Sequence, residues 1–412
     1  MDLPTSVAVS TTVVVRAVDE QLFSLVVEIS SARQEVGERM IGNGRYSVFK
    51  YIPHHLVNKI LLRTSAKSLL RFKSVCKSWY SLIKETDFIQ QHFHCTINND
   101  QPISFAVLSY ARNLDNKFHL ISIEEGWESE NGGNNHEWKA DLRISKECWE
   151  DLHMLSCNCL ICFYGHSCIY ICNPATKELI NLSKLTSKDG CGFGFDAARS
   201  QYKVVELYND FSSNALICRV ITLGTMYWRS ITIEGIPPFR GKAESPTFVN
   251  GSIYWLIMSP LCIFRFDVGN EKLKLIHVPE NIERCEQRQE EQDIHICLVE
   301  LQGKICFVEH NRVKEMLVIW MLKGSGEDVF WMEKYSIEVN NIPHSPGFHI
   351  TPICIRNKKI LLQSLMNGLV SYDMKSKKCV TVFKPRGWFQ TVVHKESLIC
   401  LYDLIIGASH LM

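Results

Sequence analysis

Apolar residues recur at helical spacing between about residues 51 and 94. Leu56 and Ile60 stand four apart, as do Val57 and Leu61, and this is the spacing of one helical face. The steps of three and four continue to Phe93. The pattern predicts three or four short helices. Because so small a unit cannot bury all of these side chains, part of its surface should need a partner.

From about Ile103 the pattern changes to short apolar or alternating runs between Asn, Asp, Gly and Pro, which predicts strands. One unit is a polar turn followed by a strand, and it begins at Cys157, Val249, Leu301, Arg356 and His394. The intervals are 92, 52, 55 and 38 residues, the first about twice a propeller blade and the others near one.

A second unit is a strand, a turn led by Asn or Asp, and a returning strand, and it begins at Ile169, Phe193, Ile263 and Leu369. Together the two units favour a β-propeller-like ring over a two-sheet sandwich. The predicted fold class is therefore α+β and multidomain. We expect a weakly ordered extension at 1–45, a small all-α module at 46–95 and a large all-β, propeller-like domain at 100–410.

Charge and cysteine content narrow the environment. The 412 residues carry a formal net charge of +1, so no global field argues for nucleic acid or a membrane as partner. Lys50–Glu85, however, holds eight basic residues and one acidic residue. The apolar run in Met1–Val15 lacks a basic start and ends at Arg16, so we expect no export signal. We therefore expect a cytoplasmic or nuclear protein whose 17 cysteines are reduced and mostly act as small buried hydrophobic residues.

Two motifs suggest ligand chemistry that the strand pattern argues against. The first is the set Cys157, Cys159, Cys162, His166, Cys168 and Cys172. On alternating strands these neighbours point to opposite faces, so buried thiols are expected rather than zinc. The second is GCGFGFD at Gly190–Asp196, where a strand and no helix follows, so its glycines should serve a bulge or close strand packing. We expect no metal and no cofactor.

The helical segment carries a specific family signal. The runs IPHHLVNKILLR, AKSLLRFKSVCKSWYSLI and DFIQQHF, within Ile52–Phe93, closely resemble an F-box. The start departs from the usual pattern. Ile52-Pro53 stands where Leu-Pro is common, and His54, His55, Asn58 and Lys59 replace the acidic positions usual around the first helix.

The remainder resembles the F-box-associated domain of plant F-box proteins of the F-box/kelch-like group, which includes the S-locus F-box proteins. The matching segments are NPATKEL (Asn173–Leu179), GFGFDAARSQYKVV (Gly192–Val205), YWRSI (Tyr227–Ile231), VNGSIYWL, IFRFDVGNEKLKLIHVP, LVIWMLKG with WMEKYSI, and KKILLQSLMNGLVSYD. Their order behind an F-box makes the combined signal strong.

The resemblance implies a non-catalytic substrate-recognition subunit of a Skp–cullin–F-box ubiquitin ligase. The helical module would bind a Skp-family adaptor, and through it cullin and RING subunits. The β domain would recruit a target protein for ubiquitination and proteasomal degradation. Carried over from the family, the adaptor-binding residues are Ile52, Pro53, Leu56, Val57, Ile60, Leu61, Leu69, Leu70 and Phe72, and the F-box core residues are Val75, Cys76 and Trp79.

Two other functions stay open at this point. One is a non-ligase propeller that binds or scaffolds proteins and carries a degenerate F-box, which the altered Ile52–Lys59 region motivates. The other is a propeller hydrolase, which would need carboxylates or histidines converging in a central channel. Candidate target-binding loops are Tyr208–Asn214, Glu124–Trp138, Glu280–Asp293 and Asn340–Phe348.

Overall fold

The computed structural model describes part of the chain and divides it into two compact units, which are considered one at a time. The described residues are 54–98, 104–110, 118–123, 138–142 and 152–406, with gaps at 166–167, 184, 188–189, 211, 226, 232, 234, 284–293, 326–327, 341, 343–348, 365–367 and 385–387. The helical unit comprises 54–98 together with Asn173–Lys177 and Lys395–Cys400, and the strands lie in the other unit. The predicted extension at 1–45 lies outside the described residues.

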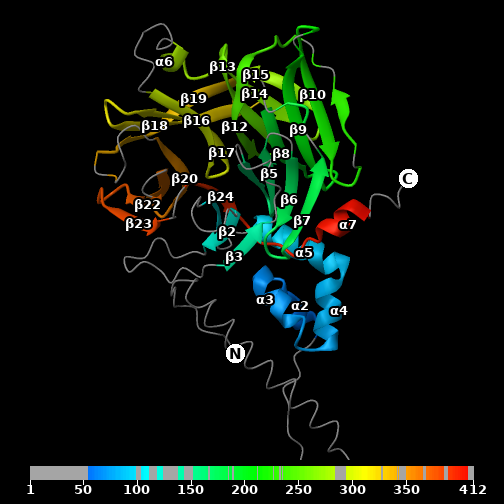
Figure 1. Ribbon diagram of the computed structural model, residues 1–412. Helices are drawn as coiled ribbons and strands as arrows, with labels where there is room; N and C mark the ends of the chain where they lie inside the picture. Colours follow the sequence, from blue (N-terminus) through cyan, green and yellow to red (C-terminus); the bar gives the residue numbers. More distant parts are fainter. Residues whose placement is uncertain are drawn as a thin grey trace, which may run out of the picture. The chain divides into compact units, whose positions relative to one another are not determined.

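Four short helices form the first unit, as the apolar spacing predicted (Figure 1): α2 (His54–Leu61), α3 (Ala66–Phe72), α4 (Lys77–Lys84) and α5 (Thr86–Asn98). Ser65 caps α3, because its side-chain oxygen accepts a hydrogen bond from the Ser68 amide. The core is built from buried residues of all four helices, with Ala175 and Leu398 completing it; the helical members are Leu61, Ala66, Leu69, Phe72, Leu82, Ile83 and Phe88.

The six residues Lys395–Cys400 are an integral part of this helical unit. Lys395 donates to the carbonyls of Thr96 and Ile97 at 3.1 Å each, which satisfies free acceptors in the last turn of α5. Glu396 forms a 2.7 Å ion pair with Lys67 of α3. The core and these polar contacts therefore join segments that are about 300 residues apart in sequence.

In the described part of the second unit, 24 strands form six four-stranded antiparallel sheets. We name them blades 1 to 6. Blade 1 contains β24 (Trp388–His394), β1 (Ser104–Tyr110), β2 (Phe118–Ile123) and β3 (Trp138–Leu142). Blade 2 contains β4 (His153–Cys157), β5 (Leu160–Gly165), β6 (Cys168–Asn173) and β7 (Glu178–Ser183). Blade 3 contains β8 (Gly190–Asp196), β9 (Gln201–Asp210), β10 (Ala215–Thr222) and β11 (Arg229–Ile231).

The other three sheets follow the same order from inner to outer strand. Blade 4 contains β12 (Arg240–Val249), β13 (Ser252–Ser259), β14 (Leu261–Asp267) and β15 (Lys272–Ile276). Blade 5 contains β16 (Ile294–Leu301), β17 (Lys304–Asn311), β18 (Met316–Ser325) and β19 (Asp328–Glu338). Blade 6 contains β20 (Ile350–Arg356), β21 (Lys359–Ser364), β22 (Gly368–Asp373) and β23 (Cys379–Phe383). Two short helices, α6 (Glu280–Glu283) and α7 (Leu401–Ile406), complete the description.

The sheets form a closed ring around an axis (Figure 1). Each inner strand contacts the next in the order β24, β4, β8, β12, β16 and β20, and β20 contacts β24 again. Blade 1 closes this ring, because its inner strand β24 pairs with β1 from the front of the domain, in a register that runs from Ser104 opposite His394 to Tyr110 opposite Trp388. The predicted fold class, a small helical module followed by a large β-propeller, is confirmed.

The turn led by Asn or Asp, predicted from the second repeat, is confirmed at all four positions. Asn173 accepts a hydrogen bond from the Ala175 amide, and Asp196, Asp267 and Asp373 accept equivalent bonds from amides two or three residues ahead. The first repeat is wrong at its last position. The segment after His394 forms no strand, and α7 begins at Leu401. β1 already occupies the place beside β24, so no second strand is needed there.

The glycines of β8 serve close packing between blades 3 and 4, as expected. A Cβ atom on Gly192 would lie 2.5 Å from the Trp255 ring, and one on Gly190 would lie 2.8 Å from the Ala243 Cβ. Trp255 is fully buried and its indole nitrogen donates to the Cys191 carbonyl at 3.3 Å. A side chain at these positions would push the two blades apart.

The described cysteines mostly fill the core. The free ones are buried or half-buried, and burial raises the pKa of the Cys172 and Cys297 thiols to about 12. Cys168, in contrast, takes part in a disulfide bond, which departs from the expectation of reduced cysteines. Among the described residues, no three His, Cys, Asp or Glu side chains gather in an arrangement that could hold a metal ion.

A buried lysine joins blades 3 and 4. Lys203 is 3% exposed, and its ammonium group lies 3.1 Å from the Asp196 carboxylate, 2.9 Å from Glu271 and 2.8 Å from the Val268 carbonyl. Burial by itself would raise the pKa of Asp196, but hydrogen bonds from Arg199 and Lys203 outweigh it and hold that pKa below its usual value. The lysine therefore neutralises two carboxylates and ties a hairpin of blade 3 to a turn of blade 4.

We expect Lys203→Met to lower the free energy of unfolding by about 3–5 kcal/mol, because it removes the buried ammonium group that contacts both the Asp196 and the Glu271 carboxylates. Arg199→Met is the matched control. Arg199 binds the same carboxylate, but its side chain is 60% exposed, so its loss should cost about 0–1 kcal/mol. Urea unfolding followed by tryptophan fluorescence measures both. Equal losses for the two variants would contradict this account.

A group of histidines lies at the junction of blades 5 and 6. The rings of His295 and His349 are stacked with centroids 4.1 Å apart, and His310 meets His349 edge-on at 6.1 Å. Burial, followed by the neighbouring charges of His349, His310 and Arg312, lowers the pKa of His295 to about 4. The stack is therefore neutral at physiological pH.

Because the pKa of His295 is lower in the folded chain than its ordinary 6.5, unfolding takes up a proton between these values. Stability should be full above about pH 6.5 and should fall as the pH drops toward 4. His295→Phe keeps a stacking ring but cannot be protonated, so it should flatten this part of the curve. Thermal unfolding across the pH range measures it, with the exposed His277→Phe as control. An unchanged slope in His295→Phe would refute the assignment.

Candidate functional site

The first helix of the helical unit leaves an apolar stripe uncovered. Leu56 is 42% exposed and Ile60 is 38% exposed, one helical turn apart on α2. Val57 and Leu61, on the adjacent stripe, turn toward the unit's core. Two neighbouring faces of α2 are therefore apolar, but the unit's own residues cover only one of them. An apolar face of this kind on a folded helix is suited to docking a partner.

The structure divides the predicted adaptor-binding residues into three groups. Leu56 and Ile60 are exposed, Val57 and Leu70 are half-buried, and Leu61, Leu69 and Phe72 are almost completely buried in the unit's own core. The buried three therefore hold the helices together in this structure. Ile52 and Pro53 lie outside the described residues, so their place in such a site stays a prediction.

The predicted F-box core residues lie near or within the helical core. Trp79 is half-buried and meets the Phe72 ring edge-on, with centroids 5.4 Å apart, and Val75 also packs against the core cluster. Cys76 stands at the start of α4, where it is the N-cap residue with extended backbone. Trp79 therefore supports Phe72 and is not itself a fully exposed contact.

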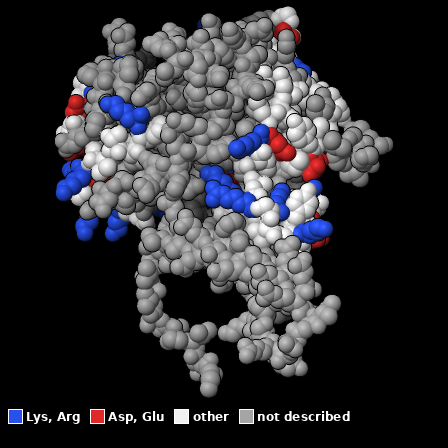
Figure 2. Space-filling view, turned by 60° about the horizontal axis from the view of Figure 1, so that its bottom comes forward, with Lys and Arg blue, Asp and Glu red and all other residues white. Residues whose placement is uncertain are grey.

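Residues 54–84 include several exposed basic residues and no acidic residue. Lys59 lies on α2 with the stripe, Arg63 follows it, and Arg71, Lys77 and Lys84 lie on the next two helices. Figure 2 shows Lys and Arg side chains at several places on the described surface in that view, with Asp and Glu beside some of them. The basic residues of 54–84 would favour encounter with an acidic partner.

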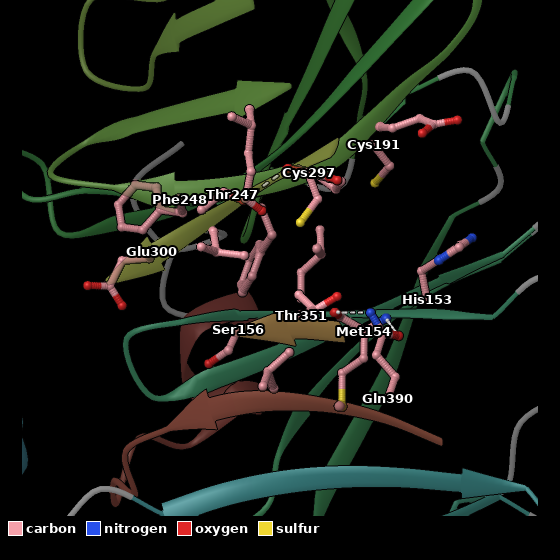
Figure 3. Close-up of a pocket in the computed structure, with 18 of the residues that line it drawn as sticks. His153, Met154, Ser156, Cys191, Thr247, Phe248, Cys297, Glu300, Thr351 and Gln390 are labelled. Carbon is pink, nitrogen blue, oxygen red and sulfur yellow. Dashed lines mark hydrogen bonds between the residues drawn. The ribbon is translucent and has the colours of Figure 1, made fainter. Parts of the chain in front are cut away.

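A second feature is a cavity on the axis of the propeller, with a volume of about 540 Å³. All six inner strands contribute to its wall, and Figure 3 shows Met154, Cys297, Thr351 and Gln390 around its middle. The Gln390 side chain bridges blades 1 and 2. Its oxygen accepts a hydrogen bond from the Met154 backbone N–H at 2.8 Å, and its nitrogen donates one to the Met154 backbone carbonyl. We call this cavity the axial channel. Its size is within the range of ligand-binding pockets.

The titratable groups of the axial channel are unevenly distributed. Lys242 and Glu244 line it from β12, and His153 and His295 stand near the starts of β4 and β16. Glu300 lies near the end of β16, where its carboxylate accepts a 2.5 Å hydrogen bond from the Gly303 amide. Sequence reasoning missed Lys242 and Glu244. Alternating charges beside Ser245-Pro246 inside a strand were the available signal.

The predicted target-binding loops are mostly outside the described residues. Tyr208–Asn214 is described except for residue 211, and it forms the turn between β9 and β10. There the hydroxyls of Ser212 and Ser213 donate to the Asp210 carboxylate at 2.6 Å each. These bonds lower the pKa of Asp210 to about 2. The role of the four loops stays a prediction.

None of the described helices has the length and apolar character to cross a bilayer. No cofactor site is assigned, because the described residues hold neither a metal-binding cluster nor a strand-to-helix glycine loop.

Comparison with known proteins gives two family matches and several relatives. Residues 50–91 match the F-box domain, and residues 106–384 match the F-box associated beta propeller domain. An F-box/kelch-repeat protein of Arabidopsis thaliana is 26% identical over 347 residues, which covers 78% of this chain and 87% of the relative. An F-box protein of the same plant is 25% identical over 389 residues, covering 82% and 83% of the two chains.

Among solved structures, apo AztD from Citrobacter koseri aligns at 8% identity over 72% of this chain and 100% of that one, with a TM-score of 0.37, a likeness too weak to support an argument. The expected closeness to S-locus F-box proteins stays a prediction. Both family matches fall on the units described above, and the propeller match alone covers well over half of the chain. The chain belongs to the family of F-box proteins that carry an F-box associated β-propeller domain.

Proposed function

We propose that this protein is the substrate-recognition subunit of a Skp–cullin–F-box ubiquitin ligase. The observation that carries the proposal is the uncovered pair Leu56 and Ile60 on α2 of a folded F-box. The helices already have a core of their own, so this stripe is not needed to fold the unit. A Skp-family adaptor would cover it, and the adaptor would supply the cullin and RING subunits.

We infer a narrower docking surface for this chain than the family pattern implies. Leu56 and Ile60 would make the central contacts, with Val57 and Leu70 at the edge, while Leu61, Leu69 and Phe72 would hold α2 in position from beneath. The basic residues of 54–84 would speed association with an acidic adaptor more than they would raise affinity. Aspartate at either central position would place a charge in a desolvated apolar contact.

The propeller would hold the target protein without chemistry of its own. Binding would raise the local concentration of the target's lysines near a ubiquitin-loaded enzyme, so the gain is proximity and orientation. The target would then be degraded by the proteasome. This assignment places the protein in the cytoplasm or the nucleus, where that machinery works.

We expect Leu56→Asp with Ile60→Asp to weaken binding of a Skp-family adaptor by about two orders of magnitude or more, because both changes fall at the centre of the contact. Calorimetry on the purified full chain measures the affinity, and the unfolding midpoint reports whether the fold is kept. The matched control is Val313→Asp, an exposed apolar residue (73%) of the propeller, which should leave adaptor binding unchanged.

Leu61→Asp gives a contrasting result that separates docking from folding. Leu61 is fully buried, so this variant should lower the unfolding midpoint, whereas the Leu56 and Ile60 double variant should not. Wild-type protein that fails to bind any Skp-family adaptor, or a double variant that binds normally, would overturn the ligase proposal. Either result would favour a propeller scaffold with a degenerate F-box.

A further inference from the structure

One inner strand of the propeller differs from the others. Every residue of β8 is buried, and β4, β16 and β20 are mostly buried or half-buried. β12 instead exposes Arg240, Lys242 and Glu244, although it lies on the axis of the ring. Exposed charges on an inner strand add nothing to the packing of the blades, so their placement needs another explanation.

The backbone of β12 is shaped around these charges. Its pairing with β13 is interrupted twice, between Arg240 and Ala243 and again between Glu244 and Thr247. At the second interruption Ser245 adopts a left-handed conformation with φ 49°, followed by Pro246. Bulges redirect side chains and are found beside binding sites more often than elsewhere in sheets. Lys242 lies within the first irregularity, and the second begins at Glu244.

Both charged side chains face the axial channel. Ala243, between them, is buried against blade 3, because its Cβ would lie 2.8 Å from a Cβ on Gly190. Lys242 and Glu244, on either side of it, are exposed, and both line the channel. Neither side chain has an ion-pair or hydrogen-bond partner among the described residues.

Away from Lys242 and Glu244, the channel has no such unpaired charges among the residues described next. Glu300 is held by the amide of its own turn. The middle is lined by neutral groups, including Thr351, Cys297 and Thr391. Thr391 is 5% exposed, and its hydroxyl is buried without a hydrogen-bond partner. The channel therefore offers one unpaired positive charge and one unpaired negative charge on its β12 wall.

We propose that the axial channel binds an extended segment of the target protein. In this segment one acidic and one basic side chain are two residues apart. This inference rests on the proposed function as a target receptor. An extended chain repeats its side chains every two residues on one face, which is the spacing of Lys242 and Glu244. The acidic residue pairs with Lys242, and the basic residue pairs with Glu244.

The volume favours a chain segment over a free amino acid. The volume of about 540 Å³ exceeds the need of so small a molecule and falls within the range for drug-sized ligands, which a few residues of peptide match. Charge complementarity then sets which segments are accepted.

The test uses the full chain purified together with a Skp-family adaptor. The probes are labelled peptides in which Asp-x-Lys or Lys-x-Asp is fixed and the neighbours vary, and a matched set with Asn and Gln in place of the charges. Both orders are included because the segment can run in either direction along β12. Fluorescence anisotropy measures binding, and peptides of one charged order should bind more tightly than the uncharged set.

Lys242→Glu should weaken the preferred peptides about tenfold or more, because a like charge then faces the acidic residue. The double variant Lys242→Glu with Glu244→Lys should prefer the opposite order. Lys272→Glu, an exposed lysine on outer strand β15 of the same blade, is the matched control and should change nothing. This reversal of preference cannot result from a general loss of stability.

Three outcomes would overturn the proposal: no peptide of either order binds better than the uncharged set, Lys242→Glu leaves binding unchanged, or native mass spectrometry finds the channel filled by a small molecule. Retention of the adaptor is measured on the same samples. Normal adaptor binding with failed peptide recognition would overturn the channel inference alone, whereas loss of adaptor binding by the wild type would overturn the proposed function.

Discussion

The hydrogen-bonded pairing of β24 with β1 is the constraint on which the propeller depends. Blade 1 takes its inner strand from residues 388–394 and its other strands from 104–142. Without β24, the strand β1 would be left with an unpaired edge on the axis, and β4 and β20 would lose the neighbour that joins them. Pairing with β24 covers that edge of β1 and completes the four-stranded sheet. It also completes the wall of the axial channel, since Gln390 and Thr391 belong to this strand.

Much of the fold could be predicted because it depends on interactions between residues that are close in the sequence. The Asx turns at Asn173, Asp196, Asp267 and Asp373 depend on a side chain and amides two or three residues away, so the sequence pattern was sufficient. The segment after His394 could not be read in this way. Its repeat resembles a second strand, but the place was taken by β1, about 290 residues earlier in the chain. Local patterns carry no information on such long-range competition.

In the candidate sites, too, local features could be predicted and features set by distant segments could not. Helical spacing identified an apolar surface on α2, but it could not tell which stripe is covered by the unit's own core. That depended on Ala175 and Leu398, which come from distant parts of the chain. Lys242 and Glu244 were missed because strand order around the axis decides whether alternating charges face solvent or a channel. An inner strand is recognised only when the ring is known. The glycines of β8 were interpreted correctly because their pattern excluded the phosphate-binding alternative.

The short segment Lys395–Cys400 has a consequence for synthesis of the chain. It follows directly on the closing strand, and it supplies Leu398 to the helical core, Lys395 to the end of α5 and Glu396 to Lys67. A ribosome that has produced the first 380 residues has therefore made neither unit in its finished form. The helices α2 to α5 are synthesised early, but the segment Lys395–Cys400 that completes their core is synthesised late. Until then their apolar surfaces are exposed and can bind chaperones. Products truncated before Lys395 would therefore compete poorly with the intact protein for its partners.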